Sequence, residues 1–329
     1  MPSGVLIFVG WVVQLFLCFY AIRFISNTIT RCILTCLPCL LLTYMVTCEV
    51  PPLLMTSMLA VTYCWLASIR LIHLTILSPN QCSTLRSFIF KFLWMFFPIV
   101  PCAPDYKEQW PIFYDLISGA VKLLVNHWMY RWLLTCPGSD SYARLIMFYI
   151  YALAFTFLSD FQSAILRTVT RDKYMLKSIT NVPLISRSLR EFWGRRYNQL
   201  IGTILRESVF QPALQHSSSP SVAALIVFLV SGLLHVHLAF ITFGDFRDTM
   251  STMTFFLLHG LACTIAAHTP FRLRAPVSWF LTLFFLVVTA PLQNGSFTKL
   301  GPDYYAVNKP PLIDNKWIPI LSVPNFCPK

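Results

Sequence analysis

The chain has 329 residues, of which 56% are hydrophobic and 12% charged, and its formal net charge is +12. About 25% of the residues of a soluble domain are charged, so this chain has too little charge to cover a globular surface. In a membrane protein a positive balance reflects basic cytoplasmic loops and anionic headgroups or ligands, not nucleic acid. The composition indicates an all-α polytopic membrane protein, and we expect residues 1–329 to form a single embedded domain.

Nine apolar runs are candidates for membrane-spanning helices, which need about 20 residues each. In chain order they are Val5–Phe24, Cys32–Cys48, Leu53–Leu77, Phe88–Val100, Val121–Cys136, Leu145–Leu158, Val222–Phe243, Met253–Ala267 and Val277–Ala290. The first run lacks a basic segment before it and is long for a signal peptide, so we expect a retained helix.

The links between these runs differ in charge. The most basic is the long link between Leu158 and Val222. Shorter links also carry basic residues: Arg23, Arg31, Arg86, Arg272 and Arg274. Three other links are acidic or nearly neutral. The first carries Glu49, the second Asp105, Lys107, Glu108 and Asp115, and the third Asp245, Arg247 and Asp248. The positive-inside rule assigns the basic links to the cytoplasm, which is self-consistent only if one run does not cross.

Val121–Cys136 is the natural exception. Lys122, Asn126, His127 and Arg131 recur at helical spacing and form a polar stripe, which is typical of an interfacial or re-entrant amphipathic helix. We therefore expect about eight spans, with both ends of the chain on the non-cytoplasmic side.

The sequence pattern also predicts the structure of two segments outside the spans. Apolar residues between Leu189 and Ile204 fall near one helical face with arginines around the other, which predicts a helix lying in the cytoplasmic interface. The segment after Pro291 is rich in Pro, Gly and Asn, and we expect it to be irregular.

The eleven cysteines lie mostly inside apolar runs, where they behave as small hydrophobic residues. The pair Cys36 and Cys39 has no second pair at zinc spacing. We therefore expect no metal site.

His235 is the most informative single residue, because a titratable group deep in an apolar run is costly and points to function. Burial favours the neutral imidazole that a general base needs, and Ser231 one turn earlier could orient the ring. The alternative is a histidine that packs helices together. His237 should face away and serve packing, and His259 in the next run would support His235.

A second cluster precedes it in the basic link. Arg187, Arg190, Arg195 and Arg196 suit phosphate binding, since guanidinium groups grip anions bidentately, although basic loops also anchor headgroups. Trp193 and Tyr197 are interleaved with them and would stack on a nucleotide or anchor the helix in the interface. Asn198 closes the cluster with an amide that can polarise a carbonyl.

Together these residues resemble the membrane-bound O-acyltransferase superfamily in its wax-synthase-like branch. The resemblance rests on the stretches Pro183–Asn198 and Ser231–His235, with a weaker match at Phe255–Gly260, so the motif-bearing core is residues 183–260. Tyr197 stands where the branch often has Trp, and Val236 where many relatives have Glu.

The resemblance implies a multi-helix chamber with a tunnel, in which Asn198 and His235 are catalytic. It also implies acyl-CoA as co-substrate, no other cofactor, and an endoplasmic reticulum membrane. The acceptor would be a fatty alcohol, giving wax esters, or a terpenoid or sterol hydroxyl with a short acyl or acetyl donor, as in secondary metabolism. The alternatives are a transporter or channel with an intramembrane histidine relay, and a catalytically silent relative.

Overall fold

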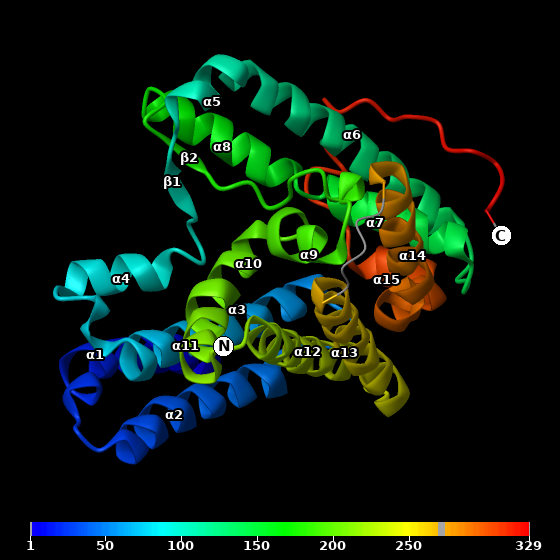
Figure 1. The fold of residues 1–329 in the computed structure, drawn as a ribbon. Coiled ribbons are helices and arrows are strands. Elements are labelled where there is room, and N and C mark those ends of the chain that lie inside the picture. The colour runs from blue at the N-terminus through cyan, green and yellow to red at the C-terminus, as the bar shows by residue number, and fades with distance from the viewer. Residues whose placement is uncertain (1, 269–273, 329) are drawn as a thin grey trace. The chain divides into compact units, whose positions relative to one another are not determined.

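The computed structural model describes residues 2–268 and 274–328, so Arg272 lies outside the described residues. Helices make up most of it (Figure 1). Contacts between residues divide the chain into two compact units, one of residues 1–97 and 201–269 and the other of residues 98–200 and 270–329. Helix α10 (Gln199–Leu205) carries the chain across the boundary.

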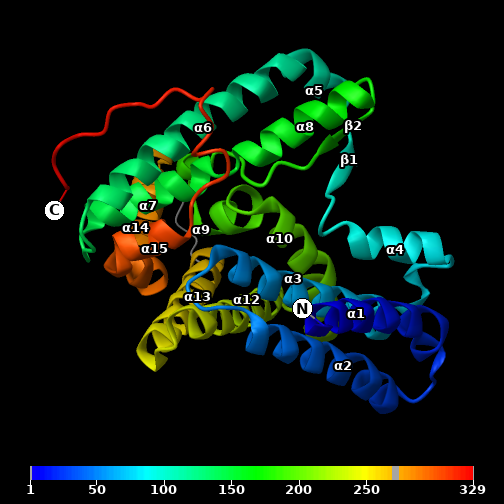
Figure 2. The ribbon, with the colours of Figure 1, turned by 180° about the vertical axis from the view of Figure 1, so that it is seen from behind.

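The regular structure of the first unit is all helical in its described residues. Its elements are α1 (Pro2–Tyr20), η1 (Ile22–Phe24), α2 (Thr28–Glu49), α3 (Met55–Ile72), η2 (His73–Leu77), η3 (Pro79–Gln81), α4 (Leu85–Leu93), η6 (Arg206–Phe210), α11 (Gln211–Ser217), α12 (Pro220–Phe243) and α13 (Phe246–His268). Helices α12 and α13 lie side by side over most of their length (Figures 1 and 2).

The ends of α12 follow from its sequence. Ser219 caps the first turn by accepting a hydrogen bond from the Val222 amide, and Pro220 occupies the first helical position, where no donor is needed. Gly244 ends the helix with φ of +67°, a left-handed conformation that glycine adopts without a steric penalty. The 24 residues between these signals form a span of about 36 Å at 1.5 Å per residue.

The second unit contains the described strands. Its elements are β1 (Ile99–Pro101), α5 (Pro104–Gln109), α6 (Ile112–Thr135), α7 (Tyr142–Ala154), α8 (Phe157–Val169), β2 (Tyr174–Leu176), η4 (Pro183–Ile185), α9 (Leu189–Glu191), η5 (Phe192–Arg196), α14 (Ala275–Leu300) and α15 (Pro302–Val307). Strands β1 and β2 pair antiparallel, and α6 packs along α7 and α8.

A buried ion-pair network joins α6 to α8. The fully buried Arg167 guanidinium donates to Asp115 at 2.7 Å, to Asp172 at 2.6 Å and to the Trp110 carbonyl at 2.8 Å. Further along the same pair of helices, Lys122 donates to Asp160 at 2.7 Å. Burial of charge is tolerable here because each cation has a carboxylate within hydrogen-bond distance.

Seven helical segments in the described residues are long and apolar enough to cross a membrane. They are Gly4–Phe24, Thr28–Glu49, Met55–Leu77, Tyr142–Val169, Pro220–Phe243, Phe246–His268 and Ala275–Leu300. The all-α polytopic fold is confirmed. The prediction that Phe88–Val100 spans is wrong, because α4 ends at Leu93 after nine residues, about 14 Å of helix against roughly 30 Å of hydrocarbon.

The predicted amphipathic run Val121–Cys136 is the second half of α6, and its polar stripe does not face water. Asn126 donates to the Tyr151 carbonyl at 2.9 Å, and His127 to the Pro311 carbonyl at 3.0 Å. Asn126 is fully buried and His127 nearly so. The polarity therefore serves contacts inside the second unit, which removes the reason for interpreting this run as interfacial.

Two further predictions are wrong. Residues 189–204 do not form one continuous helix, because α9 runs directly into the π-helix η5 and the helical path then breaks at Tyr197 and Asn198 before α10. The segment after Pro291 is not irregular throughout, since α14 continues through Pro291 to Leu300 and α15 follows. Membrane helices tolerate such an internal proline because neighbouring groups satisfy the freed carbonyl.

We predict that Arg167→Met destabilises the protein strongly, because Asp115 is then left buried without a cation. The expected loss is about 3–5 kcal/mol in the free energy of unfolding, measured as a lower thermal midpoint of the detergent-solubilised protein. Lys309→Met is the matched control, since it breaks an exposed pair with Asp314 at 3.7 Å and should leave the midpoint unchanged. Equal midpoints for the two variants would contradict a stabilising role for the network.

Candidate active site

His235 lies on α12, 16 residues from its start. Its Nδ1 is 2.8 Å from the backbone carbonyl oxygen of Ser231. A carbonyl can only accept, so Nδ1 carries the proton of the neutral ring, and Nε2 keeps its lone pair. The ring is thus held in the tautomer that leaves a free base. The group that contacts the ring is the backbone carbonyl of Ser231, whereas the sequence suggested its side chain.

His237, two residues further on, is held in the opposite tautomer. Its Nδ1 accepts a hydrogen bond from the Trp65 indole at 2.9 Å, and its Nε2 lies 3.0 Å from the Thr47 hydroxyl. The indole can only donate, so Nδ1 is unprotonated and Nε2–H donates to Thr47. Both nitrogens are therefore used to join α2 and α3 to α12, which is the packing role expected from the sequence.

Gly232 permits the close approach of α13 to this part of α12. A Cβ atom at Gly232 would lie 3.0 Å from Met253 Sδ and 3.1 Å from Phe256 Cβ. Gly260 has the same role on α13, where a Cβ would lie 3.0 Å from Phe228 Cβ. Phe256 consequently reaches His235, with ring centroids 4.4 Å apart.

His259 is fully buried and packs on Phe255, with ring centroids 4.1 Å apart. The pairs Gly232 with Phe256 and Gly260 with Phe228 set the antiparallel register of the two helices. In that register His259 is level with Leu229, six residues from His235, or roughly 9 Å along the axis. Support of His235 by His259 stays a prediction.

The arginine-rich stretch of the second unit is built around a π-helix. Residues Phe192–Arg196 form η5, and Asn198 stands between η5 and α10, where the helical path is interrupted. π-Helical turns are uncommon and frequent at functional sites. The rings of Phe192, Trp193 and Tyr197 pack on one another with centroids 4.9–5.1 Å apart, and burial raises the pKa of Tyr197.

The four arginines of this stretch are not equivalent. Arg196 donates to Glu191 at 2.6 Å and to the Asn181 carbonyl at 3.2 Å, so it serves the local fold. Glu191 also accepts from the Arg187 amide at 2.8 Å, and this bond, together with Arg196, lowers the pKa of its carboxyl. The side chains of Arg187, Arg190 and Arg195 are exposed, and these three are the better candidates for an anionic ligand.

The structure therefore defines a polytopic helical membrane protein with a base-competent histidine inside a span. Residues 176–258 match the family described as membrane bound O-acyl transferase, about a quarter of the chain. The match includes Ser231, Asn198 and His235 and ends one residue before His259. This stretch is therefore similar to the membrane-bound O-acyltransferase family.

Curated relatives agree with the wax-synthase-like branch. The chain is similar to acyl-CoA–sterol O-acyltransferase 1 of Arabidopsis thaliana, with 29% identity over 56% of this chain and 55% of the relative. It is also similar to the long-chain-alcohol O-fatty-acyltransferase of Simmondsia chinensis, with 31% identity over 41% and 42%, and to probable long-chain-alcohol O-fatty-acyltransferase 7 of Arabidopsis thaliana, with 37% identity over 33% and 36%. The chain spans about half the length, or less, of these relatives.

We predict that Gly232→Ala destabilises the pairing of α12 with α13, because the new methyl group meets the backbone-proximal Cβ of Phe256, which cannot swing away. The expected loss is about 1–3 kcal/mol, read as a lower thermal midpoint in detergent. Gly194→Ala is the matched control, since a Cβ there has nothing within 4 Å. A Gly232→Ala midpoint no lower than that of Gly194→Ala would show that the helices do not pack this closely.

Proposed function

We propose that the chain is an acyl-CoA-dependent O-acyltransferase that transfers an acyl group to a lipophilic alcohol, at an endoplasmic reticulum membrane. The observation that carries the proposal is the tautomer of His235, which leaves an unprotonated Nε2 within the stretch matched by the family. The names of the relatives, which specify sterol and long-chain-alcohol O-acyltransferases, support an alcohol as acceptor.

The reaction is direct transfer from the thioester. The acceptor O–H bond breaks and its proton passes to His235 Nε2, while the oxygen bonds to the thioester carbonyl carbon. The carbon–sulfur bond then breaks, and the leaving thiolate of coenzyme A takes the proton from Nε2. Every atom is accounted for without a covalent acyl-enzyme, because the thioester is already activated, and the site only has to align the partners and move one proton.

Asn198 supplies the second element of the mechanism. Its side-chain amide donates to the thioester oxygen, where negative charge develops as the alcohol attacks. It lies at the interruption between η5 and α10, outside both helical segments. A residue at such an interruption can be aimed at a ligand without distorting a continuous helix.

The exposed guanidinium groups of Arg187, Arg190 and Arg195 hold the phosphates of coenzyme A in this proposal. Arg196 is committed to Glu191 and contributes by keeping the stretch in shape. Trp193 and Tyr197 form an aromatic surface beside them for the adenine base. The polar head of the donor thus stays outside the hydrocarbon, while the acyl chain and the acceptor reach the site from lipid.

The test is ester formation by membranes containing the chain, with radiolabelled acyl-CoA of several lengths and a panel of long-chain alcohols, sterols and terpenoid alcohols. We expect His235→Ala to lower kcat by about 10²–10⁴, the usual contribution of a general base. His237→Ala is the matched control on the same helix and should lower the thermal midpoint while leaving turnover per folded molecule within a few-fold of the wild type.

The two possible failures are distinguishable. If the wild type forms no ester with any acceptor, the chain is not an acyltransferase for these classes and the silent-relative alternative is favoured. If ester forms but His235→Ala is as active as His237→Ala, the reaction stands and the base has been assigned to the wrong residue.

A further inference from the structure

Phe256 of α13 is the side chain that covers the imidazole of His235. The two ring centroids are 4.4 Å apart and the planes are inclined by 34°. Phe256 is 3% exposed, so its own position is fixed by packing. The contact exists because Gly232 has no side chain to hold α13 away from α12.

The imidazole is therefore restrained in two independent ways. The Ser231 carbonyl fixes one edge of the ring and decides which nitrogen carries the proton, while Phe256 covers its face and limits rotation away from that bond. An aromatic face also attracts a cation more than a neutral ring. The contact thus stabilises the imidazolium that forms as His235 takes the acceptor's proton, more than it stabilises the resting state.

We propose that Phe256 is a positioning residue for His235 in acyl transfer, an inference that rests on the function proposed above. The proton donor is the alcohol, the proton acceptor is His235 Nε2, and Phe256 takes part in no bond that forms or breaks. Its effect falls on the turnover step and not on the binding of acyl-CoA or alcohol.

The neighbouring Phe255 offers a matched control. It lies on the same helix, is also 3% exposed, and packs on His259 in place of His235. Phe256→Leu and Phe255→Leu remove the same atoms at equal burial, so both should lower the thermal midpoint by similar amounts. We expect kcat to fall roughly tenfold or more for Phe256→Leu, since small misplacements of a catalytic group are costly. The KM values should be unchanged, and Phe255→Leu should keep kcat within about twofold.

A purely structural role would change both variants alike. Equal kcat values for Phe256→Leu and Phe255→Leu, or a Phe256→Leu defect confined to KM, would overturn the positioning role while leaving the acyltransferase proposal intact. Absence of ester formation by the wild type would instead remove the function on which the inference rests.

A second, independent observation concerns the side of the membrane on which parts of the second unit lie. Strand β1 (Ile99–Pro101) pairs with β2 (Tyr174–Leu176), and the Cys102 amide donates to the Lys173 carbonyl beside them at 3.0 Å. The link before α6 and the link after α8 therefore share one face. Lys and Arg outnumber Asp and Glu by seven to two between residues 170 and 197, so this face is cytoplasmic.

The path between these two links must cross the membrane an even number of times. The segment Tyr142–Val169, formed by α7 and α8, is one crossing. Of the other two helices on the path, α5 has only 6 residues, whereas the 24 residues of α6 extend about 36 Å, enough for roughly 30 Å of hydrocarbon. It is tied to α8 at one end by Asp115 and to α7 at the other by Arg144, which donates to the Cys136 and Pro137 carbonyls.

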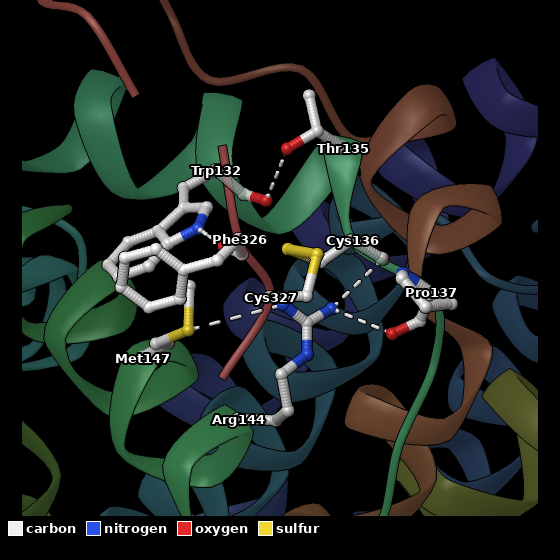
Figure 3. Close-up of a disulfide and its surroundings, with 8 residues drawn as sticks. All are labelled: Trp132, Thr135, Cys136, Pro137, Arg144, Met147, Phe326 and Cys327. Atoms are coloured by element: carbon white, nitrogen blue, oxygen red, sulfur yellow. Dashed lines mark hydrogen bonds between the residues drawn. A yellow bond between two sulfur atoms is a disulfide. The ribbon is translucent and has the colours of Figure 1, made fainter. Parts of the chain in front are cut away.

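Figure 3 shows the far end of α6, where Cys136 forms a disulfide with Cys327 of the C-terminal segment. Disulfides persist in oxidising compartments and are rare in the cytosol. The indole of Trp132 donates to the Phe326 carbonyl beside the disulfide at 2.9 Å. Charge is balanced on this side, with two basic and two acidic residues between Gly301 and Pro328.

The geometry points to α6 as an eighth span, with the Cys136–Cys327 disulfide on the non-cytoplasmic side, where it fastens the C-terminal segment to the end of α6. This corrects the sequence-based placement of the link around Asp105 on the non-cytoplasmic side. The predicted total of eight spans is recovered, with α6 crossing and α4 not crossing.

The test uses the full chain in sealed microsomes, with one epitope tag inserted after Asp140, after Ser217 or after Lys329. We expect added protease to remove the tag after Ser217 and to spare the other two until detergent is added. Digestion of the tag after Asp140 in sealed vesicles would overturn the crossing of α6.

The disulfide is tested on the same membranes by denaturing without reductant and labelling thiols with maleimide-polyethylene glycol. Cys136→Ser should gain one label, because it frees Cys327, whereas Cys48→Ser, which removes an exposed free thiol, should lose one. Loss of one label by Cys136→Ser would show that Cys136 is a free thiol and would overturn the disulfide.

Discussion

The constraint on which the structure depends is that a hydrogen-bonding group inside hydrocarbon has to be satisfied by protein, because no water is there to do it. This constraint explains the defined partners of several polar groups in the spans. Arg167 has two carboxylates and a carbonyl, and His237 uses both of its ring nitrogens. Asn126 reaches a carbonyl on α7. Polarity in these helices therefore stabilises the packing inside each unit before it serves any chemistry.

His235 departs from that pattern, and the departure gives a physical reason for a functional role. Its Nδ1 is satisfied by the carbonyl of its own helix, so the tautomer of the ring is fixed without a hydrogen-bond partner from another span. Nε2 keeps its lone pair, which accepts the proton of the alcohol in the proposed function. His237, two residues away in the same apolar run, uses both of its ring nitrogens in hydrogen bonds to neighbouring helices. The difference between a base and a packing residue lies in which acceptors and donors surround the ring, and not in its depth.

The sequence predicted the all-α membrane fold, four of the spans to within four residues at both ends, and the packing role of His237. These follow from apolar run length and from position on one helix, both of which are local. It could not predict that Ser231 acts through its carbonyl, because a hydroxyl and a carbonyl one turn earlier are equally near in sequence. It also missed the disulfide, since Cys136 and Cys327 are 191 residues apart and no spacing rule connects them. The contact of Phe256 with His235 likewise depends on helix register, which glycines set only once the helices meet.

The interpretation of α6 shows how a sound local rule fails when its assumed surroundings are wrong. A polar stripe on an apolar helix indicates an interface only if the stripe faces water. Here Trp128, His127 and Arg131 donate to carbonyls of the C-terminal segment, which has no regular structure after α15 and so offers unpaired acceptors. The two segments satisfy each other: the helix supplies donors that lipid would not tolerate, and the irregular segment supplies acceptors that no ladder uses. The polar side chains of α6 and the irregular C-terminal segment thus form a single contact. Either feature, interpreted alone, predicts the wrong location for its segment.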